Sequence, residues 1–448
     1  MKLRIKKEDR LFIGVIALIH IVFFLLACSF KRIYMGDSFE YIYEAVNIRD
    51  YLFFYSGNAA MPIEPEYMTQ RQPLYPILLL GVYLFSVNNW IVLLLQNALS
   101  VVNLLYLRRT ITGLGYKKKY DKLLLLLLAA YPAQFINANT IAPDILLQSF
   151  TLLYFGLFVR LFTTRQLKYG LLMGLSLAAG ALVKPVLYPF AVVHVVVIIT
   201  LAIYQKTTLQ RQLLVALLPL CIVMLYSYHN SLRTGKYHFS SNQAFNAIYY
   251  YYPFISAREG ADSANRFLAQ ERAKCAAIPD YASRYDYANQ RGSELLRNNF
   301  IPYMAFHLKH SARLFIEPGK GEIDLFTGRL TYGRLYSKEQ TGFYANIKTK
   351  GAAGLVDYAS NNPSLIIVLV IGLFNMVRLV GLFWFFRRSH THRGILLFTF
   401  ILLGYFAVAA GPIANTRYLL PVSPIVIGLA VMGIAARQVQ RAKTNIPK

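Results

Sequence analysis

The sequence predicts an all-α polytopic membrane protein on three observations. Hydrophobic residues make up 56% of the 448 residues, charged residues only 15%, and the mean hydropathy is +0.41. Soluble domains usually carry about 25% charged residues, and a chain this apolar would expose large hydrophobic patches in water. The composition therefore excludes a soluble enzyme and a disordered chain. The formal net charge of +26 is explained by basic loops beside a membrane, so nucleic acid is not an expected partner.

Ten apolar stretches are long enough, or nearly so, to cross a bilayer as helices, which takes about 17–25 residues. The first follows a basic N-terminal segment that has no small-residue cleavage site, so we expect an uncleaved anchor. The ten predicted spans are residues 11–30, 90–107, 123–141, 145–161, 169–183, 186–204, 212–228, 364–386, 394–410 and 419–435.

A further apolar stretch, residues 73–88, decides the predicted topology because it is short and contains Pro73 and Pro76. If it lies along the membrane surface, the strongly basic short loops all fall on one side, with 22 Lys and Arg residues against three acids. The positive-inside rule favours this arrangement. It places both termini in the cytoplasm and predicts a multi-pass protein of the cell inner (plasma) membrane. Amphipathic helices are then expected on the membrane surface at 37–50, 73–88 and 299–316.

This topology divides the chain into three regions. A transmembrane module covers residues 1–228 and includes a first outer loop at 31–89. An extracytoplasmic loop region covers 229–363, and C-terminal transmembrane helices cover 364–448. A short loop at 411–418 also opens on the outer face.

Acidic residues at the outer face are the first candidate site residues, because a charge beside the bilayer is costly unless it is paired or functional. Asp37 follows the first predicted span, and its structural explanation is an N-cap. Glu40 and Glu44 lie on the same helical stripe and are interpreted as a solvated face. Asp144 lies between two apolar runs, where it could cap the next helix. Two acids emerging on one face are nevertheless the minimum needed to activate a hydroxyl and to organise a cation or a leaving group.

Basic residues on the same face are the complement of these acids. Lys184 ends a predicted span, Arg417 lies in a turn bounded by Gly and Pro, and Arg71 precedes the surface stretch. Each alone is explained as an interfacial anchor. Three cations that converge on one wet face would instead suit a phosphate at the bilayer boundary.

Several sequence motifs together resemble the GT-C membrane glycosyltransferases, in the branch of the protein O-mannosyltransferases and the aminoarabinose transferase of lipid A (glycosyltransferase family 39-like). The motifs occur in the family's order and cover most of residues 1–240 and 394–425. They are GDSFEYIYEA, RQPLYPILLL, YPAQFINANTIAPD, LVKPVLYPF, HNSLRTGKYHFSS and GPIANTRYLLPVSP.

The resemblance implies a GT-C fold and a transferase that uses a polyprenyl-phosphate-linked sugar on the extracytoplasmic face. The essential carboxylate of the family maps onto Asp37, and a second acid maps onto Asp144. The Arg-Tyr pair of the late turn, Arg417 and Tyr418, would hold the lipid phosphate, with help from Lys184 and Arg71.

Some members of that family hold a divalent metal ion near a Glu of the first outer loop and a His of a later one. The resemblance therefore makes Glu64 or Glu66, together with His229, a candidate metal pair. The motifs do not extend over residues 250–360, so the acceptor (lipid A, protein or polysaccharide) stays open.

The sequence thus predicts an integral membrane glycosyltransferase, with Asp37 acting on an acceptor hydroxyl and Lys184 and Arg417 facing the departing phosphate. A secondary transporter or lipid flippase is the alternative from another class; transporters usually place ionisable groups deep in spans and contain broken helices. An O-antigen ligase or polymerase that uses diphosphate-linked glycans is a further alternative, since composition does not separate the donors.

Overall fold

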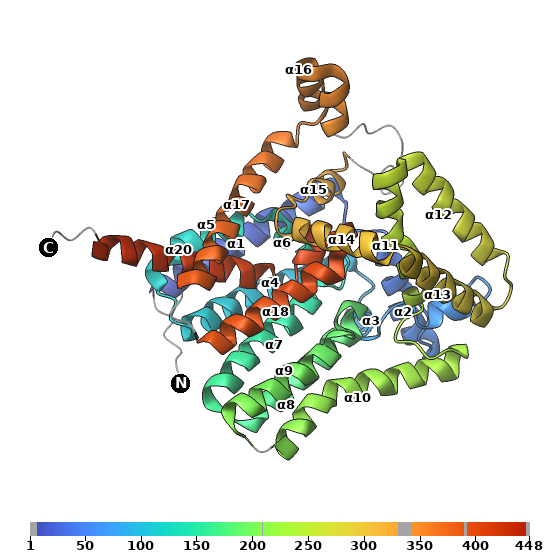
Figure 1. The fold of residues 1–448 in the computed structure, drawn as a ribbon, viewed down its shortest axis with the longest axis horizontal. Helices are drawn as coiled ribbons and strands as arrows, with labels where there is room; N and C mark the ends of the chain where they lie inside the picture. Colours follow the sequence, from blue (N-terminus) through green and yellow to red (C-terminus); the bar gives the residue numbers. More distant parts are fainter. Residues whose placement is uncertain (1–6, 208, 330–342, 389–391, 445–448) are drawn as a thin grey trace.

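The computed structural model describes residues 7–207, 209–329, 343–388 and 392–444, and within them the chain is helical throughout, apart from its turns and one isolated β-bridge. Figure 1 shows long helices packed side by side, with a group of helices from the middle of the chain at one end. The helices are α1 (Lys7–Phe30), α2 (Ser38–Tyr51), α3 (Leu74–Tyr83), α4 (Asn89–Gly113), α5 (Asp121–Ala129), α6 (Pro132–Ala138), α7 (Asp144–Thr164), α8 (Leu167–Val183), α9 (Phe190–Gln205), α10 (Leu209–Thr234), α11 (Asn242–Glu259), α12 (Ala261–Ala276), α13 (Tyr281–Asn298), α14 (Phe300–Ser311), α15 (Lys320–Phe326), α16 (Phe343–Asn361), α17 (Leu365–Arg388), α18 (Arg393–Ala410), α19 (Thr416–Leu419) and α20 (Ser423–Thr444).

Seven helices among the described residues are long and apolar enough to cross a membrane, which supports the predicted class of an all-α polytopic membrane protein. They correspond to seven of the ten predicted spans. Two further predicted spans, at 169–183 and 419–435, form the shorter apolar helices α8 and α20. The seven helices are Asp9–Phe30, Asn89–Gly113, Asp144–Thr164, Pro185–Gln205, Gln212–Thr234, Leu365–Arg387 and Arg393–Ile413.

The prediction of a single span at 123–141 is wrong. The helix stops at Ala129 and restarts at Pro132, which gives the separate helices α5 and α6. Pro132 causes this break, because it has no N–H to donate to the preceding turn and because its ring clashes with a carbonyl group of that turn. Arg378 of α17 donates to the backbone carbonyl of Leu127 at 2.8 Å and so satisfies an acceptor at the end of α5.

The surface stretch predicted at 73–88 forms only the ten-residue helix α3, about 15 Å long and half the thickness of a bilayer core. The other two predicted amphipathic segments also form helices, as α2 and as α14 followed by a 3-10 turn at Ala312–Phe315. Part of the predicted loop region 229–363, residues 330–342, lies outside the described residues.

Helices α11 to α14 form a bundle with a small core of its own, separate from the main core of the long helices. This core contains Ile248, Tyr251 and Phe254 of α11, Leu295 of α13 and Tyr303 of α14. Two contacts seat the bundle on the end of α18. Tyr250 donates from its hydroxyl to the carbonyl of Ala409 at 2.7 Å, and His307 Nε2 lies 2.8 Å from the carbonyl of Val408.

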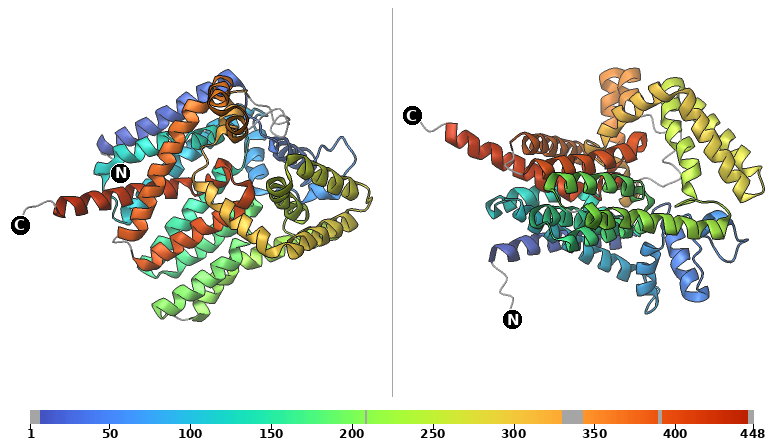
Figure 2. Two further views of the ribbon diagram at one scale, coloured as in Figure 1. Left: turned by 45° about the horizontal axis from the view of Figure 1, so that its top comes forward. Right: turned by 60° about the horizontal axis from the view of Figure 1, so that its bottom comes forward.

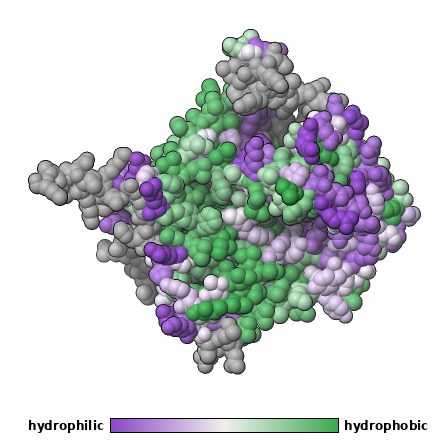
Figure 3. Space-filling model, viewed as in Figure 1, coloured by the Kyte–Doolittle hydropathy of each residue, from purple (hydrophilic) through white to green (hydrophobic). Residues whose placement is uncertain are grey.

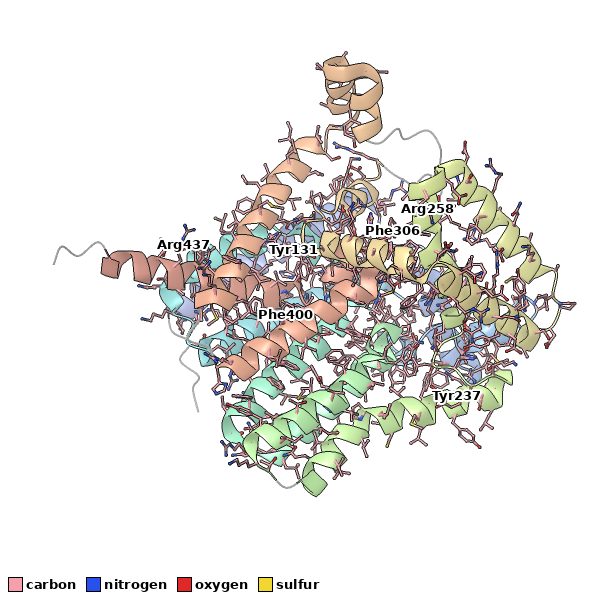
Figure 4. The ribbon with its side chains drawn as sticks, viewed as in Figure 1. Tyr131, Tyr237, Arg258, Phe306, Phe400 and Arg437 are labelled. Carbon is pink, nitrogen blue, oxygen red and sulfur yellow. The ribbon has the colours of Figure 1, made fainter. Side chains whose placement is uncertain are left out.

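The surface divides into an apolar belt and two polar ends. In Figure 3 the apolar colour covers the side of the long helices, and the hydrophilic colour gathers over α12 and α13. Phe400, labelled on α18 in Figure 4, is exposed within this belt. The start of α1 and the end of α20 both lie at the end of the molecule away from α12 and α13 (Figure 2).

Candidate active site

The segment that follows α1 is joined to the segment that precedes α7, and this junction brings the two predicted acids together. The Ile141 N–H donates to the carbonyl of Ile33 at 2.8 Å, and Tyr34 forms a parallel β-bridge with Ile141. The hydroxyl of Ser38 donates to the carbonyl of Ile141 at 2.6 Å. Asp37 and Asp144, the residues next to these contacts, therefore face a common space.

Arg417 occupies the centre of this space and binds both carboxylates. Its Nη1 and Nη2 donate to the two oxygens of Asp37 at 3.2 and 2.8 Å, in the bidentate geometry that suits a guanidinium. Its Nε donates to Asp144 at 2.6 Å.

The ion pairs continue on both sides of Arg417. Lys184 Nζ donates to the second oxygen of Asp144 at 2.7 Å, and Arg71 Nη1 lies 3.9 Å from Asp37. Arg71 also donates to Glu40. Charges of opposite sign thus alternate along a chain of six groups, which we call the ion chain: Glu40, Arg71, Asp37, Arg417, Asp144 and Lys184.

Local structure fixes the turn that carries Arg417. The side chain of Asn415 accepts from the backbone N–H groups of Arg417 and Tyr418 at 3.0 and 3.3 Å, as the N-cap of α19. Tyr131, which lies in the middle of the molecule in Figure 4, donates from its hydroxyl to the carbonyl of Thr416 at 3.1 Å. Gln148 donates to the carbonyl of Leu420 at 2.7 Å.

Aromatic rings cover the two ends of the ion chain. The Lys184 ammonium lies 5.5 Å from the ring centre of Tyr418, and the Arg71 guanidinium lies 5.1 Å from that of Tyr41. Both distances are within the range of cation–π attraction. Tyr418 therefore lies beside the predicted cations.

Burial and charge have opposite effects on the pKa of Asp37. Burial by itself raises the pKa of the carboxyl, but the charges of Arg417 and Arg71 outweigh it, and the pKa lies well below its ordinary value. Asp37 is consequently ionised and strongly paired.

In the structure, ion pairs rather than helix capping account for the positions of Asp37 and Asp144. Asp37 precedes α2 but makes no side-chain cap hydrogen bond, and Asp144 is the first residue of α7 with both of its oxygens bound to cations. The interpretation of Glu40 and Glu44 as a solvated face is wrong. Glu40 pairs with Arg71, and Glu44 is buried.

The candidate metal pair, Glu64 or Glu66 with His229, does not belong to a larger group of metal-binding side chains in the described part of the chain. Within the described residues, no group of three or more His, Cys, Asp and Glu side chains could hold a metal ion. Glu64 precedes the 3-10 turn Pro65–Met68 that contains Glu66, and His229 is exposed on α10. Glu64, Glu66 and His229 thus do not form a three-ligand group, and the pairing of Glu64 or Glu66 with His229 stays a prediction.

Sequence reasoning identified five members of the ion chain and missed Glu40. The sequence feature that indicates Glu40 is its spacing of three residues from Asp37, which places the two carboxylates on one side of a helix. Asn415 and Gln148 were also missed, because a neutral amide that holds a turn has no distinctive pattern in the sequence.

No family model matches this sequence, and no curated protein matches it.

Proposed function

We propose that this protein is a membrane-embedded glycosyltransferase that moves a sugar from a polyprenyl-phosphate donor to an acceptor on the extracytoplasmic face. The observation that carries the proposal is the ion chain, in which Arg417 lies between Asp37 and Asp144. Three cations beside an apolar belt suit a phosphate that is attached to a lipid tail. The basic loops at the opposite end of the helices support an extracytoplasmic position for the ion chain.

The proposed reaction is a single displacement with inversion. The acceptor hydroxyl oxygen forms a bond to the anomeric carbon of the sugar, and the bond from that carbon to the phosphate oxygen breaks. The hydroxyl proton passes to Asp37, and the lipid phosphate leaves with one additional negative charge. Arg417 and Lys184 stabilise this growing charge, a term that usually dominates in such reactions.

Charge balance supports this division of roles. The ion chain contains three acids and three bases, so its formal net charge is zero. When Asp37 takes the proton, the chain becomes positive by one charge in the same step that makes the phosphate more negative. The combined net charge of the ion chain and the phosphate therefore stays constant during the reaction. A change in net charge would be costly in a buried site.

The test is transfer of a radiolabelled sugar in membranes with and without the protein. Polyprenyl phosphates that carry different sugars are compared with polyprenyl diphosphates, and the labelled product is identified. We expect product only with the protein and a monophosphate donor. Product from diphosphate donors alone would indicate the ligase or polymerase alternative.

Asp37→Asn tests the catalytic assignment, and Asp50→Asn is the matched control because Asp50 pairs with Arg49 at the other end of α2. Loss of a general base lowers rates by about 10²–10⁴-fold. We expect a fall of this size for Asp37→Asn and none for Asp50→Asn, at equal amounts of protein in the membrane. Near-normal turnover by Asp37→Asn would contradict the assignment.

A transporter or lipid flippase is the second candidate, and the break between α5 and α6 is the observation that favours it. Broken helices and buried polar side chains within spans, such as His20 and Gln148, are also features of transporters. Movement of a labelled polyprenyl-phosphate sugar across proteoliposomes, without release of polyprenyl phosphate, would identify this activity.

A further inference from the structure

In this structure, carboxylates occupy both edges at which the Arg417 guanidinium can bind an oxyanion in a bidentate way. Its Nη atoms bind Asp37 and its Nε binds Asp144, while Lys184 also binds Asp144. A phosphate that binds Arg417 in a bidentate way therefore competes with a carboxylate at either edge of the guanidinium. One of the carboxylates has to give way.

Electrostatics requires such an exchange. The ion chain is formally neutral, and adding a phosphate without moving a carboxylate would crowd like charges in a poorly solvated space. A bidentate contact of the phosphate with Arg417 has to replace a contact with Asp37 or Asp144.

Asp37 is the carboxylate that can be displaced. The side chain of Asp144 has no exposed surface, and both of its oxygens are bound to cations. Asp37 is 16% exposed and lies in the junction before α2. Arg71 lies only 3.9 Å from Asp37, so the displaced carboxylate keeps one cation beside it.

We propose that the donor phosphate takes Arg417 from Asp37, and that this exchange frees Asp37 to accept the proton of the acceptor hydroxyl. The inference rests on the proposed function and adds an order to it, because donor binding must precede productive binding of the acceptor.

The exchange explains how Asp37 can act as a base although its ion pairs in the resting site oppose this role. Arg417 and Arg71 hold the pKa of Asp37 well below its ordinary value, and a carboxylate in that state is a poor base. Loss of Arg417 as a partner, together with the negative charge of the phosphate, raises that pKa. Asp37 becomes a competent base only when the leaving group is in place.

Carbodiimide labelling of Asp37 tests the exchange, because dicyclohexylcarbodiimide reacts with protonated carboxyl groups. The purified full-length protein is labelled alone, with farnesyl phosphate, and with farnesol as the uncharged control, and labelled peptides are quantified by mass spectrometry. We expect farnesyl phosphate to increase labelling of Asp37 by about tenfold for each unit by which its pKa rises. Farnesol should have no effect, and labelling of Asp50 should not change.

Arg417→Gln provides an independent arm. This variant should label strongly at Asp37 without any ligand, and farnesyl phosphate should add nothing further. Size-exclusion chromatography checks that the variant is folded; if it is not, the wild-type arm decides alone.

Two different failures can be told apart by measuring binding of radiolabelled farnesyl phosphate in the same samples. Binding with unchanged or reduced labelling of Asp37 would overturn the exchange and leave the proposed function intact. No binding of farnesyl phosphate would overturn the proposed function and the exchange with it.

Discussion

Glu44 lies one helical turn after Glu40 on α2, and its side chain is only 3% exposed. Its Oε2 has no hydrogen-bond partner among the residues that the structure describes. Burial raises the pKa of its carboxyl to about 8, although the charges of Arg233 and Arg71 oppose this. Tyr226 is the other titratable group that faces it. Glu44 is therefore a buried acid that is protonated at neutral pH.

We expect Glu44→Gln to stabilise the protein increasingly as the pH rises. Below the ordinary pKa of 4.5 the carboxyl is protonated in both the folded and the unfolded chain. Between that value and about 8, the unfolded chain releases the proton while the folded protein keeps it. The free energy of unfolding then falls by up to about 1.4 kcal/mol for each pH unit.

Thermal unfolding of wild-type protein and Glu44→Gln across this pH range measures the effect. The gap between their melting temperatures should be small at the acidic end and widest at the basic end. Glu64→Gln is the control because Glu64 is exposed. An equal gap at every pH would contradict the linkage to Glu44.

At the residue scale, the sequence singled out five of the six members of the ion chain, although each of them also had a structural explanation. Their catalytic and binding roles stay predictions. Asp37, Asp144, Lys184, Arg417 and Arg71 were singled out because charges beside the bilayer need partners. The pairing itself was not predictable, since nothing in the sequence brings residue 37 next to residue 417. That contact depends on the junction between Ile33 and Ile141.

At the scale of elements, the break after α5 makes room for a network of buried amides. Gln148 of α7 exchanges two hydrogen bonds with Gln134 of α6, accepts from Asn103 of α4 and donates to the carbonyl of Leu420. His20 of α1 joins the network through Ser100. The network ties α6 and α7 to the turn that carries Arg417.

Gln148→Leu should therefore weaken both the fold and the site. It removes four hydrogen bonds. Hydrogen bonds between membrane helices average about 0.6 kcal/mol each, so a loss of about 2 kcal/mol is expected. Thermal unfolding and transfer assays measure the two effects. Ser149→Ala is the matched control, because its hydroxyl donates to the carbonyl of Ile145 within the same helix α7. Unchanged stability of Gln148→Leu would contradict a supporting role.

Hydropathy predicted the long spans well, because continuous apolar runs of sufficient length have few other structures available. It failed at 123–141, where the average over the window hides Pro132 and the polar residues Gln134, Asn137 and Asn139. Those residues are buried by tertiary packing, which a hydropathy average does not register.

At the scale of the whole molecule, the proposed topology predicts which surfaces water-soluble reagents reach. Ala269 is exposed on α12, and Lys117 is exposed in the turn between α4 and α5 at the opposite end. In a chain with its three native cysteines replaced, Ala269→Cys should react with a membrane-impermeant maleimide in intact cells. Lys117→Cys should react only after the membrane is permeabilised. The reverse pattern would invert the topology and place the ion chain on the cytoplasmic side.

The separate core of α11 to α14 has an evolutionary consequence. Because these helices bury their apolar residues mainly against one another, substitutions there can accumulate without altering the packing around Arg417. Selection can thus change the surface of α11 to α14 while the ion chain and its supporting contacts are inherited unchanged.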